Sequence, residues 1–190
     1  RADIRGNLLV ATGEKTIVIN DSFPGGIDTG KWTQSTSGSG SITATAGVVR
    51  FATGVTANSQ ATMVFNQSRP FLEGASILFS TDLTLGDTGA TNNKRRWGMF
   101  TASDGYFFQL NGTTLQAVVR SNVTGSVVET TTDLDFTLDT NNHLYDIEYA
   151  DNSVAFSIDG IIYLNLGGNV SAARTASLDL TANFENINSG

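Results

Sequence analysis

The chain has 190 residues, including 20 glycines, 2 prolines and no cysteine, and its formal net charge is −7. This acidity argues against a nucleic-acid partner, because phosphates are bound by basic surfaces. The lack of cysteine excludes disulfides and thiolate metal sites. No apolar run approaches the ~20 residues that span a bilayer, so we expect no membrane insertion.

Residues 1–20 contain two short apolar runs, 7–11 and 16–20, on either side of a Thr-Gly-Glu turn. They predict a β-hairpin, an extended arm that docks on another chain, or two further strands of the main body. The segment 21–32, with an aspartate, a Gly-Gly turn and a tryptophan, then indicates the start of a domain. We therefore divide the chain into an N-terminal arm or hairpin, 1–20, and one β-structured body, 21–190.

The first half of the body contains short runs in which apolar residues alternate with polar ones, as in half-buried strands. A Gly/Ser stretch at 35–41 predicts a hairpin loop ahead of these runs. The expected strands are 42–45, 48–51, 61–66 and 76–85.

The central stretch 94–120 gives the strongest signal for strand pairing. Three runs rich in aromatic or β-branched residues, 95–100, 106–110 and 115–120, are separated by Ser-Asp-Gly and Asn-Gly-Thr clusters. Asp-Gly and Asn-Gly between such runs are typical of tight hairpin turns. The stretch therefore predicts a three-stranded antiparallel meander.

Further strands are expected after the meander, at 126–132, 144–150, 154–158, 161–165 and 178–185. No repeat of fixed period is found, which argues against a solenoid or propeller. About a dozen strands separated by turns indicate an all-β sandwich or barrel.

Two parts of the body resemble a known superfamily. The start at 21–32 and the sequences LYDIEY, 144–149, and VAFSIDG, 154–160, resemble the concanavalin A-like lectin/glucanase superfamily, which includes laminin-G-like modules. In that family a strand of H-x-Y-x-I type precedes a V-x-F-x-x-D-G hairpin. The resemblance implies an all-β fold, a two-sheet antiparallel jelly-roll sandwich, to which the N-terminal arm or hairpin is added.

The central stretch and the end of the chain carry a second resemblance, to structural proteins of tailed bacteriophages. The similar segments are 95–100, 105–108, 112–115, 118–120 and 184–190. This resemblance implies a virion protein exposed on the particle, on a head, tail or baseplate. Its partners would be other virion proteins or copies of itself, and host-surface glycan.

Paired carboxylates would support catalysis, because the superfamily contains glycosidases. Asp146 and Glu148 are two apart on an expected strand, so they share a face about 7 Å apart, near the roughly 6.5–9.5 Å of inverting glycosidases. The superfamily's glucanases, however, carry three acids on one strand face, as Glu-x-Asp-x-Glu, and here the third is missing. Alternation with Tyr145, Ile147 and Tyr149 also fits a core face opposite a solvated face. We therefore expect no enzyme, with a β-glucan hydrolase ranked last.

A glycan site is expected in the central stretch, because sugar rings stack on aromatic side chains and sugar hydroxyls bind amides and charged groups. The candidates are Arg95, Trp97, Tyr106, Phe107, Gln109 and Arg120. Since 106–108 are all aromatic, their side chains must point to both faces of the sheet. For Trp97 and Tyr106 the alternative is that their side chains are buried in the core of the sandwich and do not contact a glycan. The basic cluster 94–96 either contacts an acidic partner or is a solvated strand end.

Metal and nucleophile chemistry have few candidates. Calcium binds carboxylate oxygens, and Asp21, Asp28 and Asp159 lie in expected turns, so Ca²⁺ is the one cofactor considered. His143 is the only histidine, which excludes a multi-histidine metal site within one chain. No Gly-x-Ser-x-Gly elbow presents a serine to it. The leading functions are a non-catalytic virion module that binds host carbohydrate and an architectural cement protein that binds no sugar.

Overall fold

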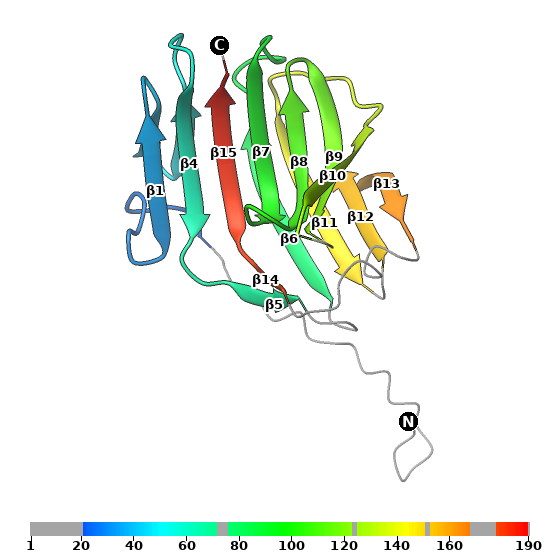
Figure 1. Ribbon diagram of the computed structural model, residues 1–190. Coiled ribbons are helices and arrows are strands. Elements are labelled where there is room, and N and C mark those ends of the chain that lie inside the picture. The colour runs from blue at the N-terminus through cyan, green and yellow to red at the C-terminus, as the bar shows by residue number, and fades with distance from the viewer. Residues whose placement is uncertain (1–20, 72–75, 123–124, 151–152, 168–177, 190) are drawn as a thin grey trace.

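The computed structural model describes residues 21–71, 76–122, 125–150, 153–167 and 178–189. Every regular element in these ranges is a β-strand, and two antiparallel sheets form a sandwich (Figure 1). The all-β sandwich prediction is confirmed. The described residues form no helix long and apolar enough to cross a membrane. The expected arm at 1–20 lies outside the described residues, so the division at residue 20 stays a prediction.

The larger sheet has seven strands, and the predicted meander forms its centre as β7, β8 and β9. In spatial order the strands are β1 (Trp32–Ser37), β4 (Ser59–Phe65), β15 (Ala182–Asn188), β7 (Asn93–Phe100), β8 (Gly105–Asn111), β9 (Thr114–Asn122) and β10 (Val127–Asp133). The late strand β15 inserts between β4 and β7. Residues far apart in the sequence therefore become neighbours across this sheet.

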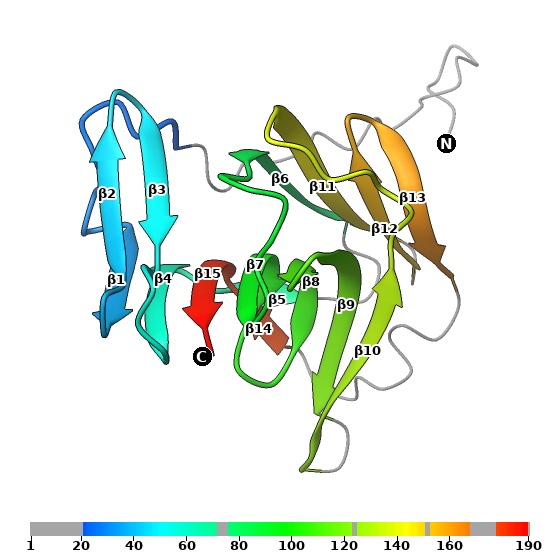
Figure 2. The same cartoon turned by 90° about the horizontal axis from the view of Figure 1, so that it is seen from above.

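The smaller sheet has four strands, in the order β13 (Ile161–Leu166), β12 (Ser153–Ile158), β11 (Asn142–Ala150) and β6 (Ile77–Thr84). The β12–β13 turn has both Asp159 and Gly160 at positive φ, as a type I′ hairpin requires. Two further pairs are β2 (Ser41–Thr45) with β3 (Val48–Ala52), and β5 (Arg69–Phe71) with β14 (Leu178–Leu180). Figure 2 shows β10 and β13 on one flank of the sandwich and β1 to β3 on the other.

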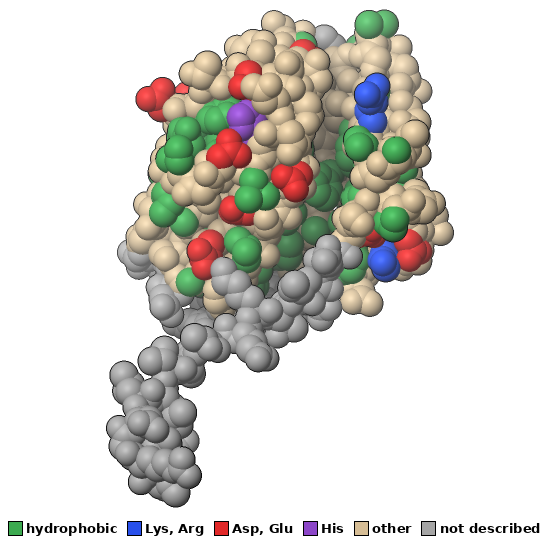
Figure 3. All heavy atoms as spheres, turned by 180° about the vertical axis from the view of Figure 1, so that it is seen from behind, with side chains coloured by type: hydrophobic (Ala, Val, Ile, Leu, Met, Phe, Trp, Pro, Cys, Tyr) green, Lys and Arg blue, Asp and Glu red, His purple; other side chains and the backbone are tan. Residues whose placement is uncertain are grey.

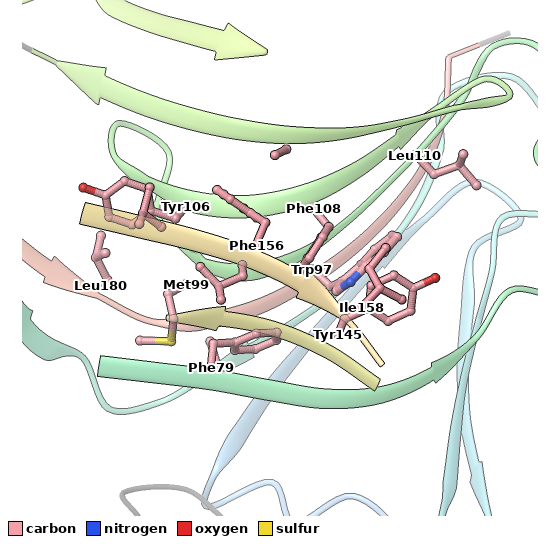
Figure 4. Close-up of a cluster of buried hydrophobic side chains, with 14 of the residues drawn as sticks. Phe79, Trp97, Met99, Tyr106, Phe108, Leu110, Tyr145, Phe156, Ile158 and Leu180 are labelled. Atoms are coloured by element: carbon pink, nitrogen blue, oxygen red, sulfur yellow. The ribbon is translucent and has the colours of Figure 1, made fainter. Parts of the chain in front are cut away.

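The core lies between the two sheets and is built from alternate residues of each strand. Trp97 and Phe108 come from the larger sheet, Tyr145 and Phe156 from the smaller, and none is more than 1% exposed (Figure 4). Their rings meet at centroid distances of 5.0–5.8 Å. Each such ring pair stabilises the fold by about 0.5–1.5 kcal/mol beyond the burial of its area. The pairs between strands of different sheets therefore stabilise the packing of one sheet on the other.

One loop prediction and one strand prediction were wrong in their limits. The stretch 35–41 is not all loop, because Ser35–Ser37 pair with β4 as part of β1. An edge strand of this kind needs only backbone pairing and tolerates polar side chains. The expected closing strand 178–185 is two strands, because the chain changes partner at Thr181, whose carbonyl oxygen accepts the Phe100 N–H.

Candidate glycan-binding site on the seven-stranded sheet

The structure divides the expected glycan site between the two faces of the larger sheet. Trp97 and Tyr106 point into the core (Figure 4), and each is 1% exposed. The Trp97 ring stacks on Phe108 with the centroids 5.8 Å apart, and Tyr106 stacks on Tyr149 at 5.9 Å. These two rings cannot stack on a sugar in the folded chain, so the core alternative applies to both.

Phe107 and Arg120 lie on the opposite, outer face of this sheet. Phe107 packs with Phe100 and Val118 in a small apolar cluster whose members are fully buried. The guanidinium groups of Arg96 and Arg120 cover the Phe107 ring, with Cζ 5.4 and 4.8 Å from its centroid. Cation–π attraction favours this arrangement. The ring therefore supports two arginines and is not an open stacking platform.

A row of polar side chains crosses the outer face at right angles to the strands. Its members oppose one another in register on β15, β7, β8, β9 and β10: Glu185, Arg96, Gln109, Gln116 and Asp133. Arg96 Nε donates to Gln109 Oε1 at 2.8 Å, and Gln109 Nε2 donates to Gln116 Oε1 at 2.9 Å. Gln116 Nε2 donates to Asp133 Oδ1 at 2.8 Å, and Arg96 Nη1 lies 3.5 Å from Glu185 Oε2. We call these five residues the polar row.

A second ion pair borders the polar row. Arg120 Nε and Nη2 donate to Glu129 Oε1 at 2.9 and 2.7 Å, and Arg120 Nη1 donates to the Thr101 carbonyl oxygen. Arg96 Nη2 lies 3.5 Å from the same Glu129 oxygen. The Arg120 side chain is only 7% exposed, so water screens these charge-assisted bonds little. Both guanidinium groups are held over the Phe107 ring.

The polar row presents fixed donors and acceptors at the protein surface. Gln109 is buried, but the Arg96 and Glu185 side chains are 13% and 16% exposed, and Asp133 is exposed at the far end. Amide, carboxylate and guanidinium groups in this order can pair with a series of hydroxyl groups. Because the side chains already hold one another, they lose little conformational freedom when a ligand binds.

Sequence reasoning placed only Gln109 of the polar row in the glycan site and missed the other four members, namely Arg96, Glu185, Gln116 and Asp133. The pairing of Gln109 with Gln116 had a usable signal, because the Asn-Gly turn sets the β8–β9 hairpin register. Glu185 had none, since it reaches the row only through the insertion of β15 beside β7.

The basic cluster 94–96 is divided by the alternation of side chains along β7. Arg95, expected in the glycan site, is not part of the polar row. Its Nη2 donates to both carboxylate oxygens of Asp87, at 2.7 and 2.9 Å, and its Nε donates to Asn93 Oδ1 at 2.7 Å. Lys94 and Arg96 share the outer face of β7, and Arg96 is the member of the cluster that joins the polar row.

The expected two-sided pattern of β11 is confirmed. Tyr145, Ile147 and Tyr149 are buried in the core, whereas Asp146 and Glu148 lie on the outer face of the smaller sheet. This pair is therefore on a different sheet from the polar row. Among the strands that the structure describes, none carries three acids on one face.

The three calcium candidates are not brought together. Asp21 Oδ2 accepts the Trp32 Nε1–H at 3.0 Å, and the Lys31 ammonium lies 3.9 Å from a carboxylate oxygen of both Asp21 and Asp28. Asp159 belongs to a separate cluster. Within the described ranges, no group of three or more His, Cys, Asp or Glu side chains is placed to hold a metal ion. Calcium binding by Asp21, Asp28 or Asp159 stays a prediction.

His143 joins two acidic turns at one end of the smaller sheet. Its Nδ1 lies 2.7 Å from Asp159 Oδ2 and its Nε2 lies 2.9 Å from Asp139 Oδ1. These bonds raise the pKa of His143 above its ordinary value of 6.5. The pKa of Asp159 is lowered, mainly by His143, and that of Asp139 by the Asn141 backbone N–H and then by His143. With both ring nitrogens engaged, His143 clamps the turns together.

Comparisons with known proteins give matches in structure and none in sequence: no protein-family model and no curated protein matches this chain. A glycoside hydrolase family 16 endo-glucanase from Bacteroides ovatus is 11% identical, with a TM-score of 0.63 over 92% of this chain and 87% of that one. The carbohydrate recognition domain of Emp47p is 13% identical, with a TM-score of 0.63 over 88% and 84% of the two chains. The carbohydrate-binding module CBM66 from Bacillus subtilis is 11% identical, with a TM-score of 0.53 over 83% and 91%.

These similarities and the two antiparallel sheets establish the fold of the chain. The chain has a concanavalin A-like jelly-roll fold, as the first resemblance implied. At 11–13% identity the similarity establishes the fold alone.

Proposed function

We propose that this chain is a non-catalytic, carbohydrate-binding module of a bacteriophage virion, and that the glycan lies along the polar row. The observation that carries the proposal is the polar row itself, which joins side chains from five neighbouring strands through hydrogen bonds and one ion pair. It lies on the outer face of the larger sheet, which faces the viewer in Figure 1. Its donors and acceptors are suited to sugar hydroxyls.

The proteins that share the fold support a carbohydrate ligand. They include a carbohydrate recognition domain, a carbohydrate-binding module and an endo-glucanase. The described strands lack a face with three acids, which favours binding without hydrolysis.

The virion location is supported by the resemblance of 95–100, 105–108 and 112–115 to segments of tailed-bacteriophage structural proteins. On that basis the partners are other virion proteins or copies of this chain, together with host-surface glycan. The place of action is then the surface of the particle.

A purely architectural role, as a cement protein without sugar binding, is the alternative. One observation favours it: every aromatic side chain whose burial the structure describes is buried or half-buried, and none is fully open to solvent. A glycan on the polar row would therefore be held by hydrogen bonds, without an open ring to stack on.

A glycan array probed with the full chain and two variants tests the proposal. Gln116→Leu removes the link between Gln109 and Asp133, whereas Gln34→Leu changes an exposed glutamine on the edge strand β1. We expect Gln116→Leu to lose glycan binding and Gln34→Leu to keep it. A folded parent chain that binds no glycan would favour the architectural role. Polysaccharide hydrolysis that stops in Glu148→Gln would replace both with a glycosidase.

A further inference from the structure

Among the described strands, β13 has the edge with the fewest features that would prevent another strand from pairing with it. It ends the four-stranded sheet, and its outer edge pairs with no strand that the structure describes. Its sequence, IIYLNL, contains no charge, proline or glycine, and Ile161 and Ile162 are 61% and 60% exposed. By contrast β10, which ends the larger sheet on the same flank, carries Glu129 and Asp133. An unpaired apolar edge without protecting charges is a template for another strand.

The outer face of the four-stranded sheet carries acidic and apolar side chains on β11 and β6, which are two and three strands away from β13. β6, β11, β12 and β13 contain no lysine or arginine. Asp82, Asp146 and Glu148 face outward, and Leu78 and Leu144, 44% and 37% exposed, lie among them. Figure 3 shows acidic and apolar side chains interspersed over one face of the molecule. A segment that fits this edge and face is apolar, β-forming and basic.

The N-terminal segment of the chain has this composition. Residues 1–20 contain three basic side chains, Arg1, Arg5 and Lys15, and two acidic ones, Asp3 and Glu14, so their net charge is +1. Because the whole chain has a net charge of −7, the body 21–190 has a net charge of −8. The run TIVIN, 16–20, follows Lys15 directly. It consists of β-branched residues and an asparagine, so its strand propensity is high.

The run 16–20 cannot reach β13 of its own copy. It joins the body at Asp21, whose carboxylate bonds to Trp32 at the start of β1. β1 and β10 are opposite edges of the larger sheet, six strand spacings or about 29 Å apart, and β13 lies on the β10 flank (Figure 2). Five extended residues span at most about 17 Å.

We propose that the run 16–20 of a second copy of this chain adds as a strand to the free edge of β13. Backbone hydrogen bonds along β13 supply the affinity, as in other strand-addition complexes. Ile161 and Ile162 become covered, and the net positive charge of residues 1–20 suits the net negative charge of the body. Because each copy has one donor run and one acceptor edge on opposite flanks, the contact is head-to-tail and generates a ring or a filament.

Cross-linking between two single-cysteine chains tests the contact. Because the native chain has no cysteine, only the introduced thiols can react. A chain with Val18→Cys is mixed with one carrying Ile162→Cys and treated with a flexible bismaleimide. The flexible linker tolerates more than one register, because a bulge shifts the pairing of β12 with β13 at Tyr163. Val128→Cys is the matched acceptor control, since it is 55% exposed on the edge strand of the other sheet.

We expect adducts that join 18 to 162, identified by mass spectrometry of the linked peptides, several-fold above those that join 18 to 128. In the full chain, Ile162→Lys should reduce the assembly to monomers in analytical ultracentrifugation, whereas Val128→Lys should not. Cross-links found only between position 162 of two copies would show that the β13 edges pair with each other. That result would overturn the proposal that the run 16–20 is the added strand. A monomeric parent chain without 18–162 adducts would overturn the proposal.

Discussion

Replacing Phe107 with alanine tests whether the outer face of the larger sheet is a packed layer in its own right. The Phe107 ring is fully buried, meets the Phe100 ring at a centroid distance of 4.5 Å, and lies beneath Arg96 and Arg120. Loss of a buried phenylalanine side chain lowers the free energy of unfolding by about 3–5 kcal/mol. For a chain of this length 1 kcal/mol corresponds to about 2–4 °C in Tm. We therefore expect Tm to fall by about 6–20 °C.

Urea denaturation followed by circular dichroism measures the change in the free energy of unfolding. The variant Phe107→Leu separates the contribution of the apolar volume from that of the ring face. Leucine keeps most of the apolar volume but loses the ring face beneath the two guanidinium groups, so we expect a loss of about 1–2 kcal/mol. Val128→Ala, at an exposed position of β10, should change stability by less than about 0.5 kcal/mol. A loss below about 1 kcal/mol for Phe107→Ala would refute the reasoning, because the ring would then not be packed.

Three further predictions follow from the buried and paired polar groups. Because the pKa of His143 is raised, its bonds to Asp139 and Asp159 contribute fully to the free energy of unfolding below pH 6.5, and this contribution is lost as the pH rises through the raised pKa. The pKa values of Asp139 and Asp159 are lowered, so their contribution is lost only on strong acidification. His143→Gln should therefore reduce Tm more at about pH 5.5 than at about pH 9, and an equal reduction at both would contradict the clamp. The Tyr145 hydroxyl is buried without a hydrogen-bond partner among the described residues, and burial raises its pKa. Tyr145→Phe should leave the free energy of unfolding unchanged or raise it by up to about 1 kcal/mol, whereas a clear loss would reveal a bonded hydroxyl. The Lys31 ammonium lies near both Asp21 and Asp28, so we expect EDTA to leave Tm unchanged, and a decrease that calcium reverses would establish the ion.

Local patterns in the sequence were sufficient where one strand or one turn decided the outcome. The Asn-Gly and Asp-Gly turns produced the meander and the β12–β13 hairpin, and the two-residue period assigned Tyr145, Ile147 and Tyr149 to the core. The limits of strands were less secure, because pairing partners set them. The chain leaves β14 for β15 at Thr181 to join a different neighbour.

The candidate site shows where local patterns stop being informative. Three successive aromatic residues at 106–108 must point to both faces of the sheet, but the strand itself does not say which face is the core. The second sheet decides this by covering Tyr106 and Phe108. Phe107 is left on the outer face, where Arg96 and Arg120 cover it.

The sequence by itself determined that this protein is an all-β sandwich of many short strands with an acidic, cysteine-free body, because alternation and turn chemistry act over a few residues. Only the tertiary structure decided which side chains form the polar row and that β13 is the end strand of the four-stranded sheet among the described strands. Glu185 lies beside Arg96 although 89 residues separate them in the chain. Such contacts depend on the order of strands in a sheet, and that order is set by how the whole core packs.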